Sequence, residues 1–143
     1  MEINKDLLES LLAEAKENPR LRQNFDLRTS FADTSQRMLN ALQPQTEVPI
    51  HQHEKTAETV ICLVGKLEEI IYEEVNGYIH EATSCCDDVI RQRNFKEVSR
   101  QILSPAEGKF GIQIPVGAWH TINVIEPSVI FEAKDGAYRR DNR

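Results

Sequence analysis

Hydrophobic residues follow a helical period only near the start of the chain. Their positions match one face of a helix, with acidic residues on the opposite face; they are Leu7, Leu8, Leu11, Leu12 and Ala15. Asn4 can cap the start of this helix, and Asn18-Pro19 ends it because the residue before a proline avoids the helical region. The pattern predicts a helix over residues 5–17. Its leucine stripe is expected to pack on the outside of a sheet or on a partner subunit.

The rest of the chain alternates short apolar runs with glycine and proline turns. Strands are predicted at 36–42, 59–64, 67–75, 78–82, 109–114, 119–125 and 129–134. The strongest turn signal is Asn76-Gly77, which favours a two-residue type I′ hairpin. Many short strands behind one helix predict a mainly β fold, a small antiparallel β-barrel or jelly roll that encloses a cavity. The barrel is expected to span about 36–134.

Two stretches lack a clear period. Residues 19–35 are polar and read as irregular, and Arg20, Arg22 and Arg28 within them are interpreted as solvated arginines rather than an anion site. Residues 83–105 carry many charges among scattered apolar positions, which is typical of an exposed insertion. A lid over the barrel mouth is the functional alternative for this insertion. Residues 135–143 read as a polar tail.

Length and charge narrow the class of protein. A chain of 143 residues is expected to form a single domain, 1–143, with a core of its own. Its net charge of −6 argues against nucleic acid and anionic membrane as partners. No apolar stretch approaches the roughly 20 residues of a membrane span, and the first residues lack the features of a signal peptide. The cytoplasm is therefore the expected compartment.

The three cysteines indicate reduced thiols rather than a disulfide framework. Cys62 lies in the predicted strand 59–64 and is interpreted as a small core residue. Cys85 and Cys86 can bind a soft metal, but no second pair stands at zinc-finger spacing. Structural zinc at these two residues is thus the minor alternative.

Candidate metal chemistry begins at His51 and His53. In a strand, residues two apart point to the same face, so the two imidazoles are expected to lie side by side. Glu58 follows a short turn and can direct its carboxylate back towards them. His120 comes after a Pro115-to-Gly117 turn on a later strand and can complete the same ligand set. Imidazoles with one carboxylate suit a divalent transition metal.

The fourth histidine, His80, is not predicted to be a ligand of this metal site. The predicted Asn76-Gly77 hairpin places His80 opposite Glu73 on an exposed face. We therefore expect these two side chains to form a surface pair rather than a ligand site.

The two stretches together resemble the paired motifs of the cupin superfamily. In the first motif, G-x5-H-x-H-x4-E-x6-G, the last four fixed positions correspond to His51, His53, Glu58 and Gly65, with Gln45 in place of the leading glycine. In the second motif, the spacing of Pro115, Gly117 and His120 matches P-x-G-x2-H. The resemblance implies a cupin barrel with one metal bound by the three histidines and the glutamate.

Four short segments of the sequence are similar to the WbuC-type cupin metalloproteins. They stand at 19–22, 36–42, 115–121 and 131–138, and the resemblance covers most of the chain outside 82–105. Some members of that group belong to surface-polysaccharide gene clusters, which implies a role in polysaccharide biosynthesis. The group carries no activity that transfers to this chain.

The expected function is a metal-binding cupin with one divalent ion, either zinc, nickel, iron or manganese, and with positions left open for a small-molecule ligand. As an enzyme, it would act on a carbohydrate-like metabolite by isomerase-, epimerase- or oxygenase-type chemistry. The alternative is a non-catalytic binding or structural module. Candidate bases beyond the ligands are Tyr72, Tyr138, Glu132 and Lys134. The last two read as an outward charged pair.

Apolar surface predicts a homodimer. Ile61, Leu63 and Trp119 point away from the expected metal face. A helix of about three turns is roughly 18 Å long, too short to cover both sheets of a barrel. Apolar patches of that size usually mark an interface. The insertion 83–105 can reach the neighbouring subunit or fold back over its own barrel.

Overall fold

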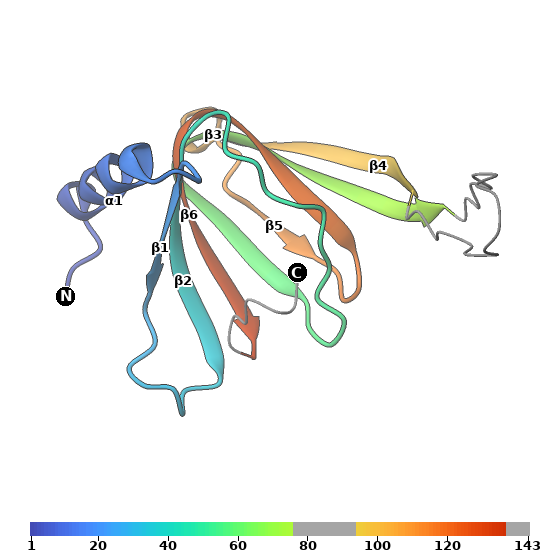
Figure 1. Cartoon of the computed structure of the whole chain (residues 1–143), viewed down its shortest axis with the longest axis horizontal. Helices are drawn as coiled ribbons and strands as arrows, with labels where there is room; N and C mark the ends of the chain where they lie inside the picture. Colours follow the sequence, from blue (N-terminus) through green and yellow to red (C-terminus); the bar gives the residue numbers. More distant parts are fainter. Residues whose placement is uncertain (76–93, 137–143) are drawn as a thin grey trace, which may run out of the picture.

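The computed structural model describes residues 1–75 and 94–136, which form one helix packed on a curved antiparallel sheet (Figure 1). The elements follow in the order α1 (Lys5–Glu17), β1 (Arg22–Asp26), β2 (Ser35–Leu42), β3 (Glu58–Val75), β4 (Asn94–Leu103), the 3₁₀ turn η1 (Pro105–Glu107), β5 (Gly111–Ile114) and β6 (Trp119–Asp135). The fold class is therefore mainly β with an N-terminal helix, as the sequence predicts. The expected hairpin at 76–77, with His80, Cys85, Cys86 and Tyr138, lies outside the described residues.

The six strands pair in the order β1-β2-β6-β3-β4, with β5 on the other edge of β3. Both β3 and β6 replace two predicted strands, because each continues through irregular pairing in its middle. The first half of β3 pairs with β5 and the end of β6, and its second half pairs with β4 and the start of β6. The sheet is thus divided into two parts, an arrangement consistent with a jelly roll. Within the described ranges, the terminal strands β1 and β4 do not pair to close a barrel.

Gly65 allows the bend between the two halves of β3. The register of β3 against β6 shifts on both sides of it, between Cys62 and Leu67. Gly65 has a φ of +95°, a conformation that glycine adopts without steric cost. The buried Ser128 hydroxyl fixes the opposite strand, accepting a bond from Lys66 N at 3.0 Å and donating one to Glu126 O at 2.6 Å.

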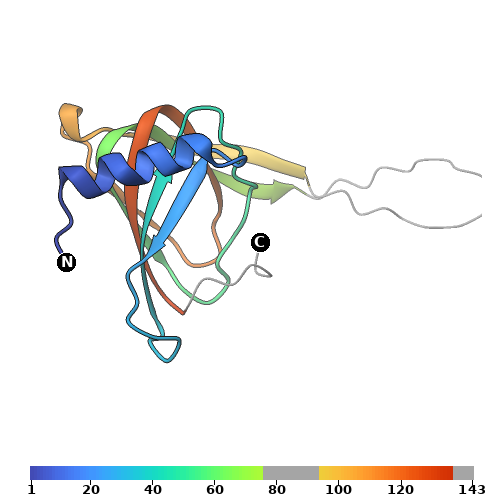
Figure 2. The same ribbon diagram turned by 60° about the vertical axis from the view of Figure 1, so that its left-hand side comes forward.

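The helix covers one face of the sheet (Figure 2). Asn4 caps it by accepting a bond from Leu7 N at 3.0 Å. The leucine stripe packs on residues of β2 and β6, so the first of its two expected locations is correct. The buried residues of this cluster are Leu11, Ala15, Leu39, Ala41 and Val129. Even-numbered residues of β1, β2 and the end of β6 consequently face the other side of the sheet.

Two strands were not predicted from the sequence. The stretch 19–35 contains β1, in which Phe25 packs towards the helix while Asn24 lines a cavity on the other face. Because the inward-facing Asn24 is polar, the sequence of β1 lacks the alternation of apolar and polar residues that usually indicates a strand. Arg22 is also buried, with Nη1 donating to Glu47 O at 2.7 Å, so the solvated interpretation of this arginine is wrong.

The second missed strand lies within the expected insertion. Residues 94–103 form β4, and most of its side chains are at least partly exposed because it lies at an edge of the sheet. Phe95 of β4 packs against Trp119, with ring centroids 5.0 Å apart. This part of the expected insertion therefore covers an apolar residue of its own chain. Residues 83–93 lie outside the described part.

None of the described helices is long and apolar enough to cross a membrane.

Candidate metal centre

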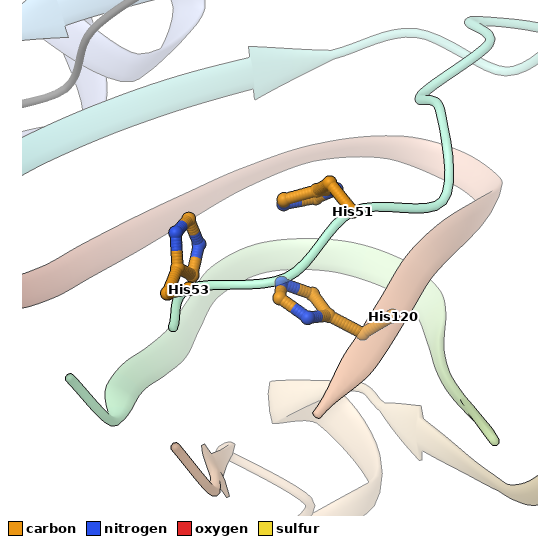
Figure 3. Close-up of side chains that lie close together, drawn as sticks. All are labelled: His51, His53 and His120. Carbon is orange, nitrogen blue, oxygen red and sulfur yellow. The ribbon is translucent and has the colours of Figure 1, made fainter. Parts of the chain in front are cut away.

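Backbone hydrogen bonds bring the three histidines together from distant parts of the chain. His51 and His120 form an antiparallel bridge, with His51 N donating to His120 O at 3.0 Å and His120 N donating to His51 O at 2.8 Å. His53 follows on the same extended segment, where its carbonyl accepts a bond from Gly117 N at 2.8 Å. The Pro115-to-Gly117 turn therefore positions both His53 and His120. Figure 3 shows the three rings gathered at one point.

The imidazoles are close enough to share an ion. The ring centroid of His51 lies 5.2 Å from that of His53 and 4.2 Å from that of His120, and the His53 and His120 centroids are 5.3 Å apart. One nitrogen from each ring lies within 4.8 Å of the other two, so this group can hold a metal ion. The sequence predicts these three residues, and the structure places them together.

The ring nitrogens are oriented by the backbone. His51 Nδ1 lies 2.8 Å from Pro49 O, and His120 Nδ1 lies 2.9 Å from Ala118 O. A carbonyl oxygen only accepts, so both Nδ1 atoms carry the proton and both Nε2 atoms present a lone pair. The buried His120 Nε2 has no hydrogen-bond partner among the described residues. This orientation of imidazoles by backbone carbonyls is typical of metal ligands.

Burial keeps two of the histidines neutral. It lowers the pKa of His51 to about 4, and the pKa of His120 is also lowered, mainly by burial. A neutral imidazole is the form that binds a metal. Both rings are therefore ready to bind at neutral pH without losing a proton.

Glu58 begins β3 beside the imidazoles. Its Oε2 lies 3.0 Å from His53 Nε2, and its Oε1 lies 3.9 Å from His120 Nε2. Burial favours the neutral carboxyl, but the hydrogen bond with His53 and the nearby imidazoles outweigh it, so the pKa of Glu58 is lowered. The structure thus brings all four predicted ligands together, with an ionised carboxylate beside three nitrogen donors. This donor set suits a divalent transition metal.

The four residues line one cavity together with side chains of β1, β2, β3 and β6 and of the segment 48–49. The other lining residues are Arg22, Asn24, Gln36, Met38, Asn40, Val48, Pro49, Glu69, Ile122, Glu132 and Lys134. The sequence predicts that Glu132 and Lys134 form an outward charged pair, and the structure contradicts this. Both share the phase of the buried Ile130 and face the cavity. Lys134 Nζ donates to Gly136 O at 3.0 Å, and partial burial lowers its pKa.

Tyr72 was the remaining described candidate for a base. It does not line the cavity, and its ring lies 6.3 Å from that of Phe95, beside Trp119 across the β3–β6 pairing. Tyr72 is therefore grouped with the aromatic residues Phe95 and Trp119 rather than with the cavity.

Glu69 is the most informative residue that the sequence analysis missed. It is 2% exposed, lines the cavity, and its Oε2 has no hydrogen-bond partner among the described residues. Burial raises its pKa well above the usual value, and the nearby Glu58 and Glu132 carboxylates raise it further. A signal was present in the sequence, since Glu69 has the same strand phase as Leu67 and Ile71, which belong to the core.

We expect Glu69→Gln to increase the free energy of unfolding of the metal-free protein at pH 7–8 by about 1–3 kcal/mol, the scale of burying a poorly paired polar group. Because the folded pKa is raised, the wild-type protein loses stability as pH rises from the unfolded value of about 4.5. The gain in the variant should therefore vanish below that pH. Urea unfolding at several pH values measures it.

Glu68→Gln is the matched control for this prediction. Glu68 is the neighbour of Glu69 but bonds Asn123 Nδ2 at 2.9 Å, and the bonds from Asn123 and Arg100 lower its pKa despite slight desolvation. Its removal should not increase stability at neutral pH. Equal effects of the two substitutions would contradict the assigned environment of Glu69.

Comparisons with known proteins identify the fold but not an activity. A family model described as "Domain of unknown function (DUF6016)" matches residues 3–84. No curated protein gives a significant match. Among solved structures, TT1209 from Thermus thermophilus is 20% identical, with a TM-score of 0.55, 95% of this chain covered and 98% of that one.

Two further solved structures are similar at the level of the fold. A cupin 2 domain-containing protein from Halorhodospira halophila is 18% identical, with a TM-score of 0.52, 83% of this chain covered and 66% of that one. A recombinant oxalate oxidase in complex with glycolate is 12% identical, with a TM-score of 0.54, 85% of this chain covered and 54% of that one. The chain thus spans less than two thirds of the length of both proteins. These likenesses show that the chain has a cupin-like fold.

Proposed function

The chain belongs to the DUF6016 family of domains of unknown function, and we propose that it is a metal-dependent enzyme acting on a small, polar, carbohydrate-like metabolite. The observation that carries this proposal is the orientation of the His51 and His120 rings. Their Nδ1 atoms are held by backbone carbonyls, so their Nε2 lone pairs remain for an ion beside a cavity rich in polar groups. A closed structural site would not require such a cavity.

His51, His53, His120 and Glu58 would hold one divalent ion, with zinc, nickel, iron and manganese as the candidates. Such an ion supplies a Lewis acid that polarises a carbonyl or hydroxyl group, or oxygen chemistry if it is iron. Four protein ligands leave one or two positions for a substrate in a five- or six-coordinate site.

The cavity offers two further groups that can exchange a proton with a bound molecule. Glu69 retains its proton to higher pH than an ordinary glutamate because its pKa is raised, and Lys134 loses its proton at lower pH than an ordinary lysine because its pKa is lowered. An acid and a base in one cavity are what isomerisation or epimerisation at a hydroxyl-bearing carbon requires. This arrangement favours such chemistry over the oxygenase type.

The carbohydrate-like substrate is supported by the polar lining and by the resemblance to WbuC-type cupins. Some of those proteins belong to surface-polysaccharide gene clusters, so we place this chain in polysaccharide biosynthesis. The composition favours the cytoplasm as its compartment.

A screen of metal-loaded protein against nucleotide sugars and sugar phosphates tests the enzyme. We expect a thermal shift that requires the metal, together with a product detectable by NMR, and we expect neither after chelation. A metal-dependent shift without turnover of any bound compound would contradict the enzyme and favour a non-catalytic binding module.

We also propose that the protein is a homodimer. Phe110 is 59% exposed and Leu63 is 37% exposed, and Val64 is also exposed. These apolar residues belong to the same region of the fold, since Cys62 N, the neighbour of Leu63 on β3, donates to Phe110 O at 2.7 Å. Light scattering at micromolar concentration should give twice the 16.4 kDa of one chain. A mass near one chain would contradict the dimer.

A further inference from the structure

One wall of the cavity carries a group of three amide side chains. Asn24 of β1 pairs with Asn40 of β2 across the strands, and Gln36 lies four residues along β2 on the same face. All three amides line the cavity that the histidines also line. Neither the metal centre nor the proposed acid and base uses them.

Their carbonyl oxygens are buried without a partner. Asn24 Oδ1, Gln36 Oε1 and Asn40 Oδ1 have no hydrogen bond within the described part of the chain, and Gln36 as a whole is only 2% exposed. Natural proteins satisfy nearly all buried polar groups, and each exception calls for a specific explanation. Three unpaired acceptors on one wall of a cavity therefore favour a role of these amides in ligand binding over a role in the fold.

The chemistry of the amide selects the ligand group. A side-chain amide offers an accepting oxygen and two donating N–H groups, and a hydroxyl both donates and accepts. A hydroxyl can therefore pair with an amide whether the amide oxygen or the amide nitrogen faces the cavity. A carboxylate only accepts, so it cannot satisfy the three oxygens.

The strand register gives the distance from the metal centre. Gln36 pairs with Lys134, and Lys134 pairs with Glu58, so Gln36 lies two strands from Glu58. At the usual spacing of neighbouring strands, this separation is roughly 10 Å between the Cα atoms. Asn40 lies about 13 Å further along β2, given the rise of about 3.3 Å per residue. The side chains of Asn40 and of the metal-binding residues extend towards each other across this separation. The space between them leaves room for a sugar-sized molecule.

We propose that Asn24, Gln36 and Asn40 form a hydroxyl-binding subsite that holds the polyol part of a polyhydroxylated ligand whose other end reaches the metal centre. The proposal rests on the proposed function and narrows its substrate class to molecules with several adjacent hydroxyl groups. Small dicarboxylates without hydroxyls do not fit this subsite. Glu69 Oε2, which also has no described partner, provides one more polar atom on another wall of the cavity.

The test is calorimetric binding to the metal-loaded protein. The probes are glucitol, glucose and glucuronate, compared with succinate and glutarate, which have no hydroxyl groups. We expect at least one polyhydroxylated probe to bind and the two dicarboxylates to bind at least tenfold more weakly. Tighter binding of the dicarboxylates, or no binding of any polyhydroxylated probe at millimolar concentration, would overturn the subsite.

The double variant Gln36→Met/Asn40→Leu removes two amides while keeping similar side-chain sizes. We expect at least a tenfold loss of affinity for the polyhydroxylated probe with unchanged metal content. Met38→Leu is the matched control, because Met38 lies between them on the same face of β2 and lines the same cavity. It should leave the affinity within about twofold. Equal affinity in the double variant and the control would overturn the proposal.

Stability gives a second readout that does not need a ligand. Removing unpaired buried acceptors should leave the melting temperature of the double variant unchanged or higher. A marked decrease would show that the amides support the fold instead, and would overturn the proposal.

Failure of the subsite is distinguishable from failure of the proposed function. Metal-dependent turnover of a ligand without hydroxyls contradicts only the subsite, whereas polyol binding that persists without metal or turnover contradicts only the enzyme.

Discussion

Substituting Gly65 by alanine is expected to lower the free energy of unfolding by about 3 kcal/mol or more. Gly65 has a φ of +95°, where any other residue is strained. A Cβ atom there would also overlap Pro127 O and the Ser128 Oγ atom, both on β6. Strain and overlap each contribute on the order of 1–3 kcal/mol. Urea unfolding followed by circular dichroism measures the loss.

Gly108→Ala separates the two contributions. Gly108 has a similar φ of +74°, but a Cβ atom there meets nothing within 4 Å. Its substitution should therefore show only the backbone strain, on the order of 1 kcal/mol. Equal losses in the two variants would contradict the close approach of β3 and β6 at Gly65.

The Gly65 variant should also lose metal affinity. Glu58 lies in the half of β3 before the bend, and His120 lies opposite Ile71 in the half after it. Both ligands therefore depend on the angle between the two halves of the sheet. We expect metal content to fall in Gly65→Ala and to remain unchanged in Gly108→Ala.

The group of three histidines was predictable because its members stand at a characteristic spacing in the sequence. His51 and His53 are separated by one residue, and the Pro115-to-Gly117 turn marks the start of the strand that carries His120. Short-range geometry of this kind is visible in a sequence. The bridge between His51 and His120 is a long-range contact, and only the structure gives it.

The rest of the cavity is difficult to predict because polar residues in proteins usually face solvent. Glu132 and Lys134 follow the buried Ile130 in phase, which indicates an inward direction, whereas their charge favours an outward one. The strand β1 is hidden in the sequence for the same reason, since its inward face carries Asn24. In a fold with a polar interior, the phase of a residue relative to buried neighbours is a better guide than its polarity.

Gln45 shows a different kind of departure. It stands where the first cupin motif has a glycine, and the structure gives it a φ of 73°. Gln45 therefore adopts the left-handed conformation, which glycine reaches without steric cost and other residues reach only with strain.

We expect the largest effect on metal content in the double variant His51→Ala/His53→Ala. Two imidazoles would be removed, and the remaining His120 and Glu58 offer only two ligands. Transition-metal sites in proteins generally require at least three protein ligands. We therefore expect the variant to hold less than about a tenth of the metal of the wild-type protein.

His80→Ala provides the matched control. His80 is the only histidine of the sequence outside the cluster, so this substitution removes an imidazole without removing a predicted ligand. Its metal content should equal that of the wild-type protein. Purification without an affinity tag is essential, because a histidine tag would bind the same metals.

Elemental analysis of the three untagged proteins is the most direct test of the metal centre. We expect about one divalent transition-metal ion per chain in the wild-type protein and in His80→Ala, and almost none in His51→Ala/His53→Ala. Equal metal in all three proteins would contradict a metal centre formed by these histidines.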